Sequence, residues 1–304
     1  MTKAERVEAA WSGKVVDRVP ISLWRHFPEA DDRAGTLADA LVDFHRRYDL
    51  DFVKLMPSGV YGVEDWGCRI AYQPNPNGVK TCVEHAVREA ADWERLRPLD
   101  VTTGALGREV RCTRLVRDLL GDGAPVLQTV FSPATTARKL AGDRIFQDMR
   151  EARPALHAGL RTIAHTTTLF ARACLDAGAD GLFLATQLAS SDLCDVATYR
   201  EFGVPYDLEV LDVVRGRVGF TLLHLHGSNI HFELLAGYPV AALNWHDRRT
   251  APSLAEGLRR TQAGVVGGIN ETGTLMRGTP TDVAAEVREA IRQTKGRRLA
   301  VAPG

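Results

Sequence analysis

The chain has 304 residues, 45% of them hydrophobic, and this is enough to bury the core of one large α/β unit. Its 38 lysines and arginines equal its 38 aspartates and glutamates, which argues against nucleic acid or an anionic membrane as a partner. No apolar run approaches the roughly twenty residues that a bilayer requires, and the N-terminal stretch is charged and helix-forming, unlike a signal peptide. We therefore expect a cytoplasmic protein, whose five cysteines, with no close pair, are reduced thiols.

Short β-branched or apolar runs recur along the chain, and each ends in polar, glycine or proline residues. They span 19–26, 51–57, 124–133, 181–187, 219–227, 240–247, 263–270 and 298–304. Helical patterns lie between them, at 36–48, 133–150, 154–177, 196–215, 229–236, 253–263 and 280–294. Strands that are apolar on both faces and alternate with helices form a parallel sheet, and eight of them predict a closed (β/α)8 TIM barrel. An open doubly wound sheet is the alternative, but no GxGxxG motif follows the first run.

The clearest predicted helix spans 280–294. Thr279 is its expected N-cap, Pro280 takes the first helical position and Asp282 completes a capping box. Gly296 is expected to end it.

The segment 57–125, which follows the second predicted strand, is a long polar insertion rich in glycine, proline and asparagine at its start. This composition predicts a hairpin or lid over the barrel mouth within a single domain of residues 1–304. The sequence stops just after the eighth predicted strand, where a closing helix is expected. Either the N-terminal helix covers that strand, or a tail beyond Gly304 is missing from the sequence.

Catalytic residues of such barrels gather at the carboxyl ends of the strands, so the polar residues there are the candidates for a site. The candidate catalytic residues are Arg25, Lys54, His246 and Asp247. The candidate substrate-binding residues are Gln128, Gln187, Asn244, Asn270 and Glu271. The candidate metal ligands are His224 and His226.

His224 and His226 lie two positions apart in the run TLLHLHGSN. Side chains of a strand alternate, so both imidazoles share one face while Leu225 points to the other. Imidazole suits zinc, and a catalytic zinc site takes about three protein ligands plus an open position. The alternative is a pair of hydrogen-bonded polar residues in a hydrated barrel mouth.

His246 ends the next predicted strand, so it lies beside the first two histidines if consecutive strands are neighbours. It is either the third metal ligand or a general acid/base whose tautomer Asp247 fixes. A structural Trp–His–Asp corner is the alternative.

Two cations near the strand ends have a functional and a structural interpretation. Lys54 holds a substrate carboxylate or an acidic side chain such as Glu271, or it only buries its stem and extends its ammonium group to the mouth. Arg25 holds an anionic group with both of its terminal nitrogens, or it pairs with Glu29 or Asp31.

Several segments together resemble the uroporphyrinogen decarboxylase superfamily over nearly the whole chain. They are RVPISLWRHFPE, QTVFSPATTARKLAG, DAGADGLFLATQ, LAGYPVAALNWHD, VGGIN and GTPTDVAAEVREAI. The resemblance implies a (β/α)8 barrel. It also implies one of two activities, porphyrinogen decarboxylation or zinc-dependent methyl transfer between a corrinoid protein and a thiol or folate acceptor.

The resemblance is closer to the methyltransferase branch. The decarboxylases match at Arg25, but their second arginine is missing here, and Lys54 and Ser58 stand where their strand 2 aspartate is expected. The methyltransferases carry an HxC zinc motif that His224 matches and His226 alters, and their last cysteine falls beyond Gly304.

The leading hypothesis is therefore a metal-dependent methyl transfer enzyme of corrinoid (cobalamin) metabolism that demethylates a small methoxylated compound, with zinc as its cofactor and a corrinoid protein as its partner. The alternatives are a metal-free lyase that decarboxylates a tetrapyrrole or small acid, and a non-catalytic barrel that binds a corrinoid or tetrapyrrole. The sequence allows a homodimer but does not specify one.

Overall fold

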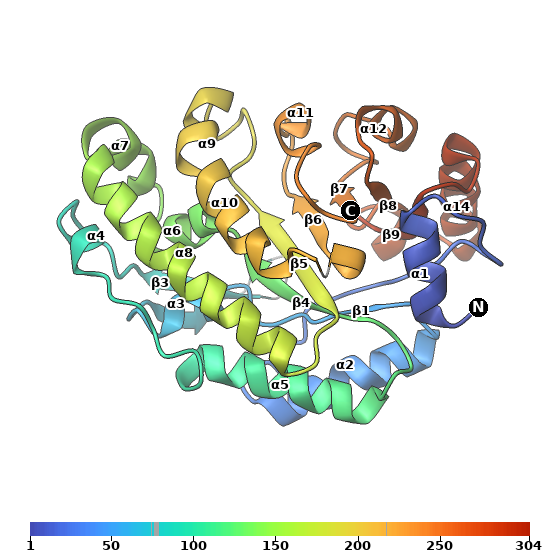
Figure 1. Cartoon of the computed structure of the whole chain (residues 1–304), viewed down its shortest axis with the longest axis horizontal. Helices are drawn as coiled ribbons and strands as arrows, with labels where there is room; N and C mark the ends of the chain where they lie inside the picture. Colours follow the sequence, from blue (N-terminus) through green and yellow to red (C-terminus); the bar gives the residue numbers. More distant parts are fainter. Residues whose placement is uncertain (74, 76–78, 217) are drawn as a thin grey trace.

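Seven parallel strands form the central sheet of the computed structural model, which describes residues 1–73, 75, 79–216 and 218–304 (Figure 1). In their order across the sheet they are β1 (Val53–Lys54), β4 (Val126–Phe131), β5 (Gly181–Thr186), β6 (Leu222–Leu225), β7 (Ala242–Trp245), β8 (Gly264–Ile269) and β9 (Leu299–Pro303). Each strand pairs with the next one along the chain, as the alternating pattern predicted, and the sheet is curled. Seven of the eight predicted strands are therefore present.

The predicted strand 19–26 is reduced to a single bridge between Ile21 and Val301. The amide of Ser22 donates to the Val301 carbonyl at 3.0 Å, while the amide of Asp51 donates to the Ile21 carbonyl at 2.8 Å. Residues 20–22 thus hydrogen-bond to β9 on one side and to the start of β1 on the other. Pro20 has no amide hydrogen, so it cannot extend this pairing into a full strand.

Helices surround the sheet (Figure 1). They are α1 (Lys3–Trp11), α2 (Ala34–Tyr48), α3 (Tyr61–Glu64), α4 (Asp92–Arg95), α5 (Gly104–Leu120), α6 (Pro133–Ala141), α7 (Arg144–Glu151), α8 (Arg153–Asp176), α9 (Val196–Phe202), α10 (Val204–Leu211), α11 (Phe232–Leu235), α12 (Leu254–Arg260), α13 (Thr274–Arg277) and α14 (Pro280–Thr294). Short 3-10 turns span Asp212–Val214 and Val218–Phe220. None of the helices in the described ranges is both long and apolar enough to span a bilayer.

Local signals account for the helix boundaries. Helix α14 has the predicted bounds, with Thr279 as its N-cap and a capping box through Asp282. The predicted helix 133–150 divides into α6 and α7 at Gly142, which has a φ of +61° that favours glycine. The predicted helix 196–215 divides at Gly203, just before the Pro205 that opens α10.

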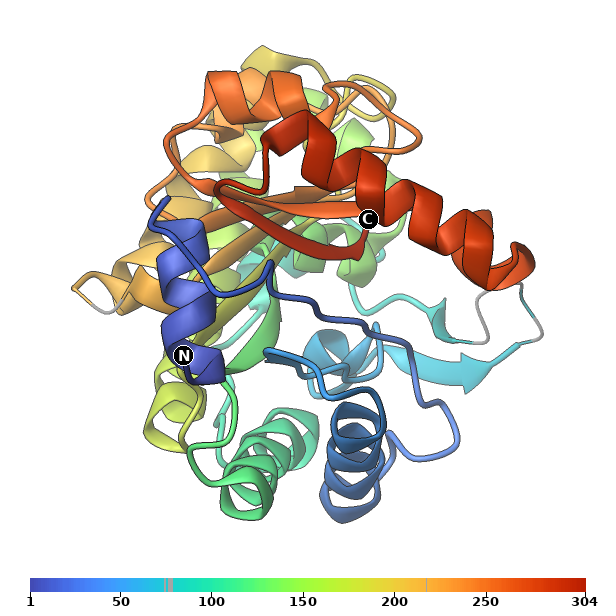
Figure 2. The same ribbon diagram turned by 90° about the vertical axis from the view of Figure 1, so that its right-hand side faces the viewer.

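The segment 57–125 contains more regular structure than the sequence predicted. Strands β2 (Arg69–Tyr72) and β3 (Lys80–Glu84) form an antiparallel hairpin that projects from one side of the molecule (Figure 2). The 17-residue helix α5 was not predicted, and it packs beside α2 as an outer helix of the sheet, so much of this segment is not a lid (Figure 2). Residues 74 and 76–78 of the predicted lid lie outside the described part of the chain.

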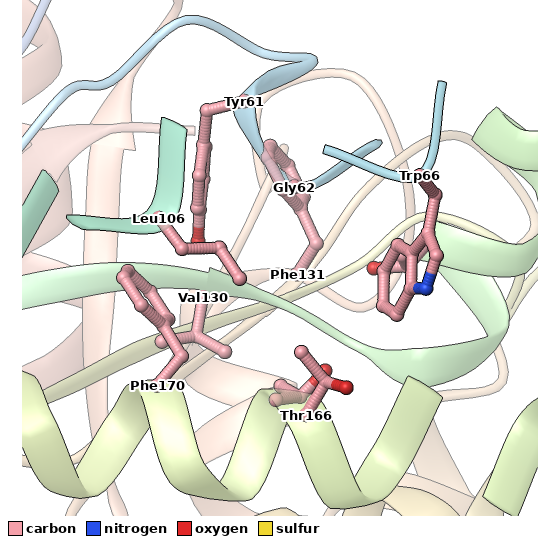
Figure 3. Close-up of a pocket in the computed structure, with 10 residues that line it drawn as sticks. Tyr61, Gly62, Trp66, Leu106, Val130, Phe131, Thr166 and Phe170 are labelled. Carbon is pink, nitrogen blue, oxygen red and sulfur yellow. The ribbon is translucent and has the colours of Figure 1, made fainter. Parts of the chain in front are cut away.

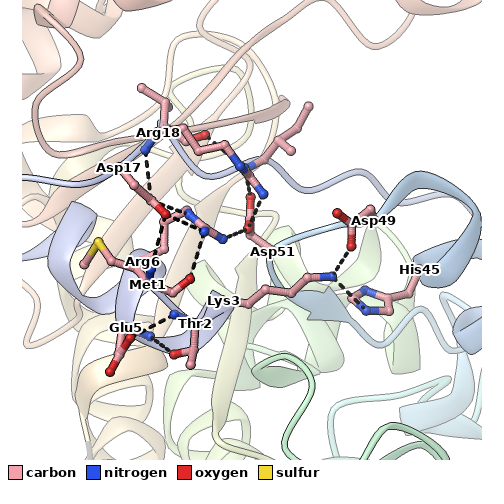
Figure 4. Close-up of polar contacts among 12 residues, drawn as sticks. Met1, Thr2, Lys3, Glu5, Arg6, Asp17, Arg18, His45, Asp49 and Asp51 are labelled. Atoms are coloured by element: carbon pink, nitrogen blue, oxygen red, sulfur yellow. Dashed lines mark hydrogen bonds and ion pairs between the residues drawn. The ribbon is translucent and has the colours of Figure 1, made fainter.

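A buried ion-pair network joins the N-terminal segment to the amino end of β1 (Figure 4). The Asp51 carboxylate is fully buried and accepts hydrogen bonds from Arg6 at 2.7 Å and from Arg18 at 2.6 Å. It also accepts the amide hydrogen of Ile21 at 2.8 Å. One carboxylate therefore holds helix α1 and the segment 20–22 against the start of the sheet.

We predict that Asp51→Asn lowers the free energy of unfolding by about 3 kcal/mol, because it removes the buried carboxylate that pairs with Arg18 and leaves Arg6 with Asp17 alone. Asp49→Asn is the matched control, since the Asp49 side chain is 81% exposed and its ion pair with Lys3 is open to solvent. Urea unfolding followed by circular dichroism compares the two variants. Equal effects of the two changes would contradict a dominant role for Asp51.

Candidate metal centre at the carboxyl end of the sheet

The strand register aligns the candidate residues across neighbouring strands. Phe131 on β4 is level with Ala185 on β5, which is level with His224 on β6 and then with Asn244 on β7. Side chains at aligned positions of a parallel sheet point to the same face. We call the face that carries His224 the inner face of the sheet.

Three imidazoles converge at the carboxyl ends of β6 and β7. The Nε2 atom of His224 lies 3.5 Å from Nδ1 of His226, which lies 3.2 Å from Nε2 of His246. All three nitrogens lie within 4.8 Å of one another. We call His224, His226 and His246 the histidine cluster.

Asn244 fixes the tautomer of His224. The amide nitrogen of this fully buried asparagine donates to the carbonyls of Val266 at 2.9 Å and Pro303 at 3.0 Å. Its oxygen therefore faces Nδ1 of His224, 2.6 Å away, and can only accept. The proton of His224 lies on Nδ1, and the lone pair of Nε2 points into the cluster.

Glu271 lies beside His246 at an ion-pair distance, without the geometry of a hydrogen bond. Its Oε1 atom lies 2.9 Å from Nδ1 of His246, and the same oxygen pairs with Arg249. A carboxylate beside Nδ1 favours the proton on that nitrogen and leaves the lone pair on Nε2. Gly304 packs against both Glu271 and His246.

The cluster suits a cation better than a proton. Nδ1 of His226 faces two nitrogens that both present lone pairs, and a single N–H can satisfy only one of them. Burial, together with the other two histidines, lowers the pKa of His224 well below its ordinary value. Burial and the neighbouring His246 lower the pKa of His226 to about 4. His224 and His226 are therefore neutral at neutral pH, and neutral imidazole is the form that binds zinc.

Asp247 was expected to orient His246, and this was wrong. Its Oδ1 atom accepts the amide hydrogen of Gly268 at 2.8 Å, so the carboxylate is directed towards β8. The loop after β7 turns at this point, where the Asp247 amide donates to the Trp245 carbonyl. Glu271, expected to bind substrate, occupies the position beside His246.

Other candidates lie away from the cluster or are engaged elsewhere. Gln128 hydrogen-bonds to Thr113 on α5, outside the sheet. Asn270 accepts the amide hydrogen of Gly273 and shapes its own loop. The Arg25 side chain is 55% exposed and pairs with Glu29. Gln187 is half-buried, and its backbone amide donates to Thr135 on α6.

Lys54 lies on the inner face, but it does not pair with Glu271. Its Nζ atom lies 2.6 Å from the sulfur of Met56 and 4.2 Å from the ring centre of Phe183. Phe183 in turn stacks on His224, with ring centres 5.5 Å apart. Phe183 was not among the predicted site residues, although it lies two positions from Ala185 in the run GLFLATQ and therefore shares its face.

A small aromatic cavity is lined by none of the three histidines (Figure 3). It lies between α3, α5 and α8, where Tyr61, Leu106 and Phe170 line it. Its volume of about 20 Å³ admits roughly one water molecule. It is too small for a substrate.

Comparison with known proteins agrees with this arrangement of a curled parallel sheet and a polar site at its carboxyl end. The family profile "Uroporphyrinogen decarboxylase (URO-D)" matches residues 2–304. The chain therefore belongs to the uroporphyrinogen decarboxylase family, as the sequence segments suggested.

Relatives from both branches of the family are similar to the chain. It is 23% identical to the methylcobamide:CoM methyltransferase MtbA of Methanosarcina mazei, over 95% of this chain and 89% of that protein. It is 26% identical to the uroporphyrinogen decarboxylase of Prochlorococcus marinus, over 71% of this chain and 62% of that protein. The match to the methyltransferase is the more extensive of the two.

Solved structures share the fold. A methyltransferase from Methanosarcina mazei superposes with a TM-score of 0.87 at 23% identity, over 100% of this chain and 93% of that one. A B12-independent methionine synthase from Shewanella superposes with a TM-score of 0.54 at 14% identity, over 97% of this chain and 88% of that one. At these identities, the two superpositions are evidence for a shared fold.

We predict that Asn244→Ala weakens zinc binding by about 10- to 100-fold, because His224 loses the acceptor that fixes its tautomer. Asn244→Asp keeps an acceptor towards Nδ1 of His224 but loses the hydrogen bonds to Val266 and Pro303, so thermal unfolding of both variants checks that the fold is retained. Competition against a chromogenic chelator measures the binding. Asn270→Ala is the control outside the cluster, and an equal loss in that variant would argue against a specific role for Asn244.

Proposed function

We propose that the chain is a metal-dependent methyltransferase of corrinoid metabolism, with His224, His226 and His246 as the ligands of a zinc ion. The observation that carries this proposal is the convergence of three imidazole nitrogens that all lie within 4.8 Å of one another. The extensive similarity to a methylcobamide:CoM methyltransferase supports the methyl group as the group transferred. A corrinoid protein is the expected methyl donor or acceptor.

Some residues of the centre would bind the ion, and others orient the residues that bind it. When bound, zinc would act as a Lewis acid that lowers the pKa of the methyl acceptor. His224, His226 and His246 would hold the ion, and three protein ligands would leave room on it for that acceptor. Asn244 and Glu271 hold two of the imidazoles in the tautomer that binds, which lowers the cost of ordering the site.

Three further features belong to the same proposal. We infer that residues 20–22 complete the sheet into a closed barrel, a view that their hydrogen bonds to β9 and to the start of β1 support. We infer one domain, in which the β2–β3 hairpin borders the mouth. A small methoxylated compound remains our preferred substrate.

The first test is the metal content of the protein purified without chelators. We expect about one zinc per chain, and a loss of zinc of at least about tenfold in His246→Ala. His157→Ala is the matched control, because His157 lies on the outer helix α8, where it contacts Glu201 and Tyr206. Full zinc retention by His246→Ala would remove His246 from the ligand set and leave a third ligand to be found elsewhere.

The decarboxylase activity of the family is the second test. We predict no stepwise decarboxylation of a porphyrinogen with four acetate side chains, because the Arg25 guanidinium pairs with Glu29 and a lysine occupies the strand 2 acid position. Product analysis by chromatography measures this activity. Efficient decarboxylation by metal-free protein would instead establish the lyase alternative.

A further inference from the structure

Lys54 is buried and Lys139 is half-buried, and both face the inner side of the sheet without a counter-charge. Within the described ranges, neither Lys54 on β1 nor Lys139 on α6 has a carboxylate within 4.0 Å, whereas Lys3 pairs with Asp49 and Lys80 pairs with Asp31. Lys54 is 8% exposed. A buried charge is normally paired, so an unpaired cation in such a place indicates a partner that binds from outside.

Neutral groups surround the Lys54 ammonium group. Its Nζ atom lies 4.2 Å from the ring centre of Phe183, 5.2 Å from that of Trp24 and 2.6 Å from the sulfur of Met56. Aromatic faces and a thioether attract a cation weakly, and none of them carries a formal negative charge. These contacts position the ammonium group but do not neutralise it.

Lys139 has similar surroundings at the next strand. Its Nζ atom lies 4.6 Å from the ring centre of Phe131, which ends β4. The backbone of Phe131 is level with Ala185, which is level with His224. Both lysines therefore lie over rings of the same inner face, on the β4 and β5 side of the histidine cluster.

The lowered pKa values of the two lysines also reflect the lack of a counter-charge. Burial without a counter-charge lowers the pKa of Lys54 to about 7. Burial, with Arg138 nearby, lowers the pKa of Lys139 to about 8. The histidine side chains carry no negative charge that would compensate a bound divalent ion, and Arg249 already pairs with Glu271. An anion beside the two lysines would favour their charged forms and raise both pKa values.

We propose that Lys54 and Lys139 form an anion-binding site beside the histidine cluster, and that the substrate is a small organic acid whose anionic end they hold. The other end of the molecule, which gives or takes the methyl group, then faces the histidines. This inference rests on the proposed function for the reaction, but the anion site itself is defined by the lysines alone. It assigns a role to Lys139, which was not among the predicted site residues.

Calorimetric titration of the metal-free protein with matched probes tests the anion site directly. Methoxyacetate and 2-methoxyethanesulfonate carry a negative charge, and 2-methoxyethanol is their neutral counterpart of similar size. We expect at least one of the anions to bind about tenfold more tightly than the alcohol. The ratio between the two anions then tells a carboxylate site from a sulfonate site.

Lysine variants identify the residues responsible. Lys54→Met and Lys139→Met keep most of the stem and remove the charge, so each should weaken binding of the preferred anion about tenfold and leave binding of the alcohol within about twofold. Lys14→Met, on the exposed surface, is the control and should change neither. Circular dichroism checks folding, and if Lys54→Met does not fold, Lys139→Met decides.

The outcomes separate this inference from the proposed function. Equal binding of all probes, or an anion preference that survives both lysine changes, overturns the anion site. A preference that appears only with zinc and ignores the lysines also overturns it, because the anion then binds the ion alone. Zinc content is measured in the same samples, so a protein without zinc but with a lysine-dependent anion preference keeps the anion site and loses the metal proposal.

Discussion

The side chain of Asn244 is the contact on which the histidine cluster depends. Its amide nitrogen donates to carbonyls on β8 and β9, while its oxygen faces His224 on β6. A single buried amide on β7 therefore links four strands. This arrangement is available only because the strands are parallel and in register, so their carboxyl ends meet at one edge.

The amino end of the sheet is stabilised by a buried ion-pair network. Asp51 lies two residues before β1, and its carboxylate binds two arginines and the amide of Ile21. The same network that holds the N-terminal segment in place also fixes the start of the strand that carries Lys54. Stability is concentrated at the amino end and chemistry at the carboxyl end, a division that is common in such folds.

Much of this fold could be predicted because its signals are local. Alternation placed His224 and His226 on one face, and the capping residues of α14 marked its start. Helix α5 was missed because the glycine- and proline-rich start of the long insertion dominated its interpretation. In the candidate centre, the choice between Asp247 and Glu271 as the neighbour of His246 depends on how the loop after β7 turns, and sequence spacing does not encode that turn.

Lys139 shows a second limit of the sequence. It lies in a helix whose pattern indicates an outer element, and only the packing of α6 against the end of β4 brings its ammonium group over Phe131. Lys54, in contrast, was identifiable because a charge within an apolar strand is rare. Residues that act from their own strand can be predicted, whereas residues that reach in from a covering helix require the tertiary structure.

The composition of the histidine cluster also determines which chemical damage it can suffer. Cysteine ligands of a metal are converted by peroxide to sulfenic and then sulfinic acids, which no longer hold the ion. The cluster contains imidazoles alone, and the five cysteines of the chain are free thiols that are not part of it. Imidazole side chains do not form sulfenic or sulfinic acids. If the cluster holds zinc as proposed, air and thiol-modifying reagents would leave its ligands intact, whereas protonation or a competing chelator would release the metal.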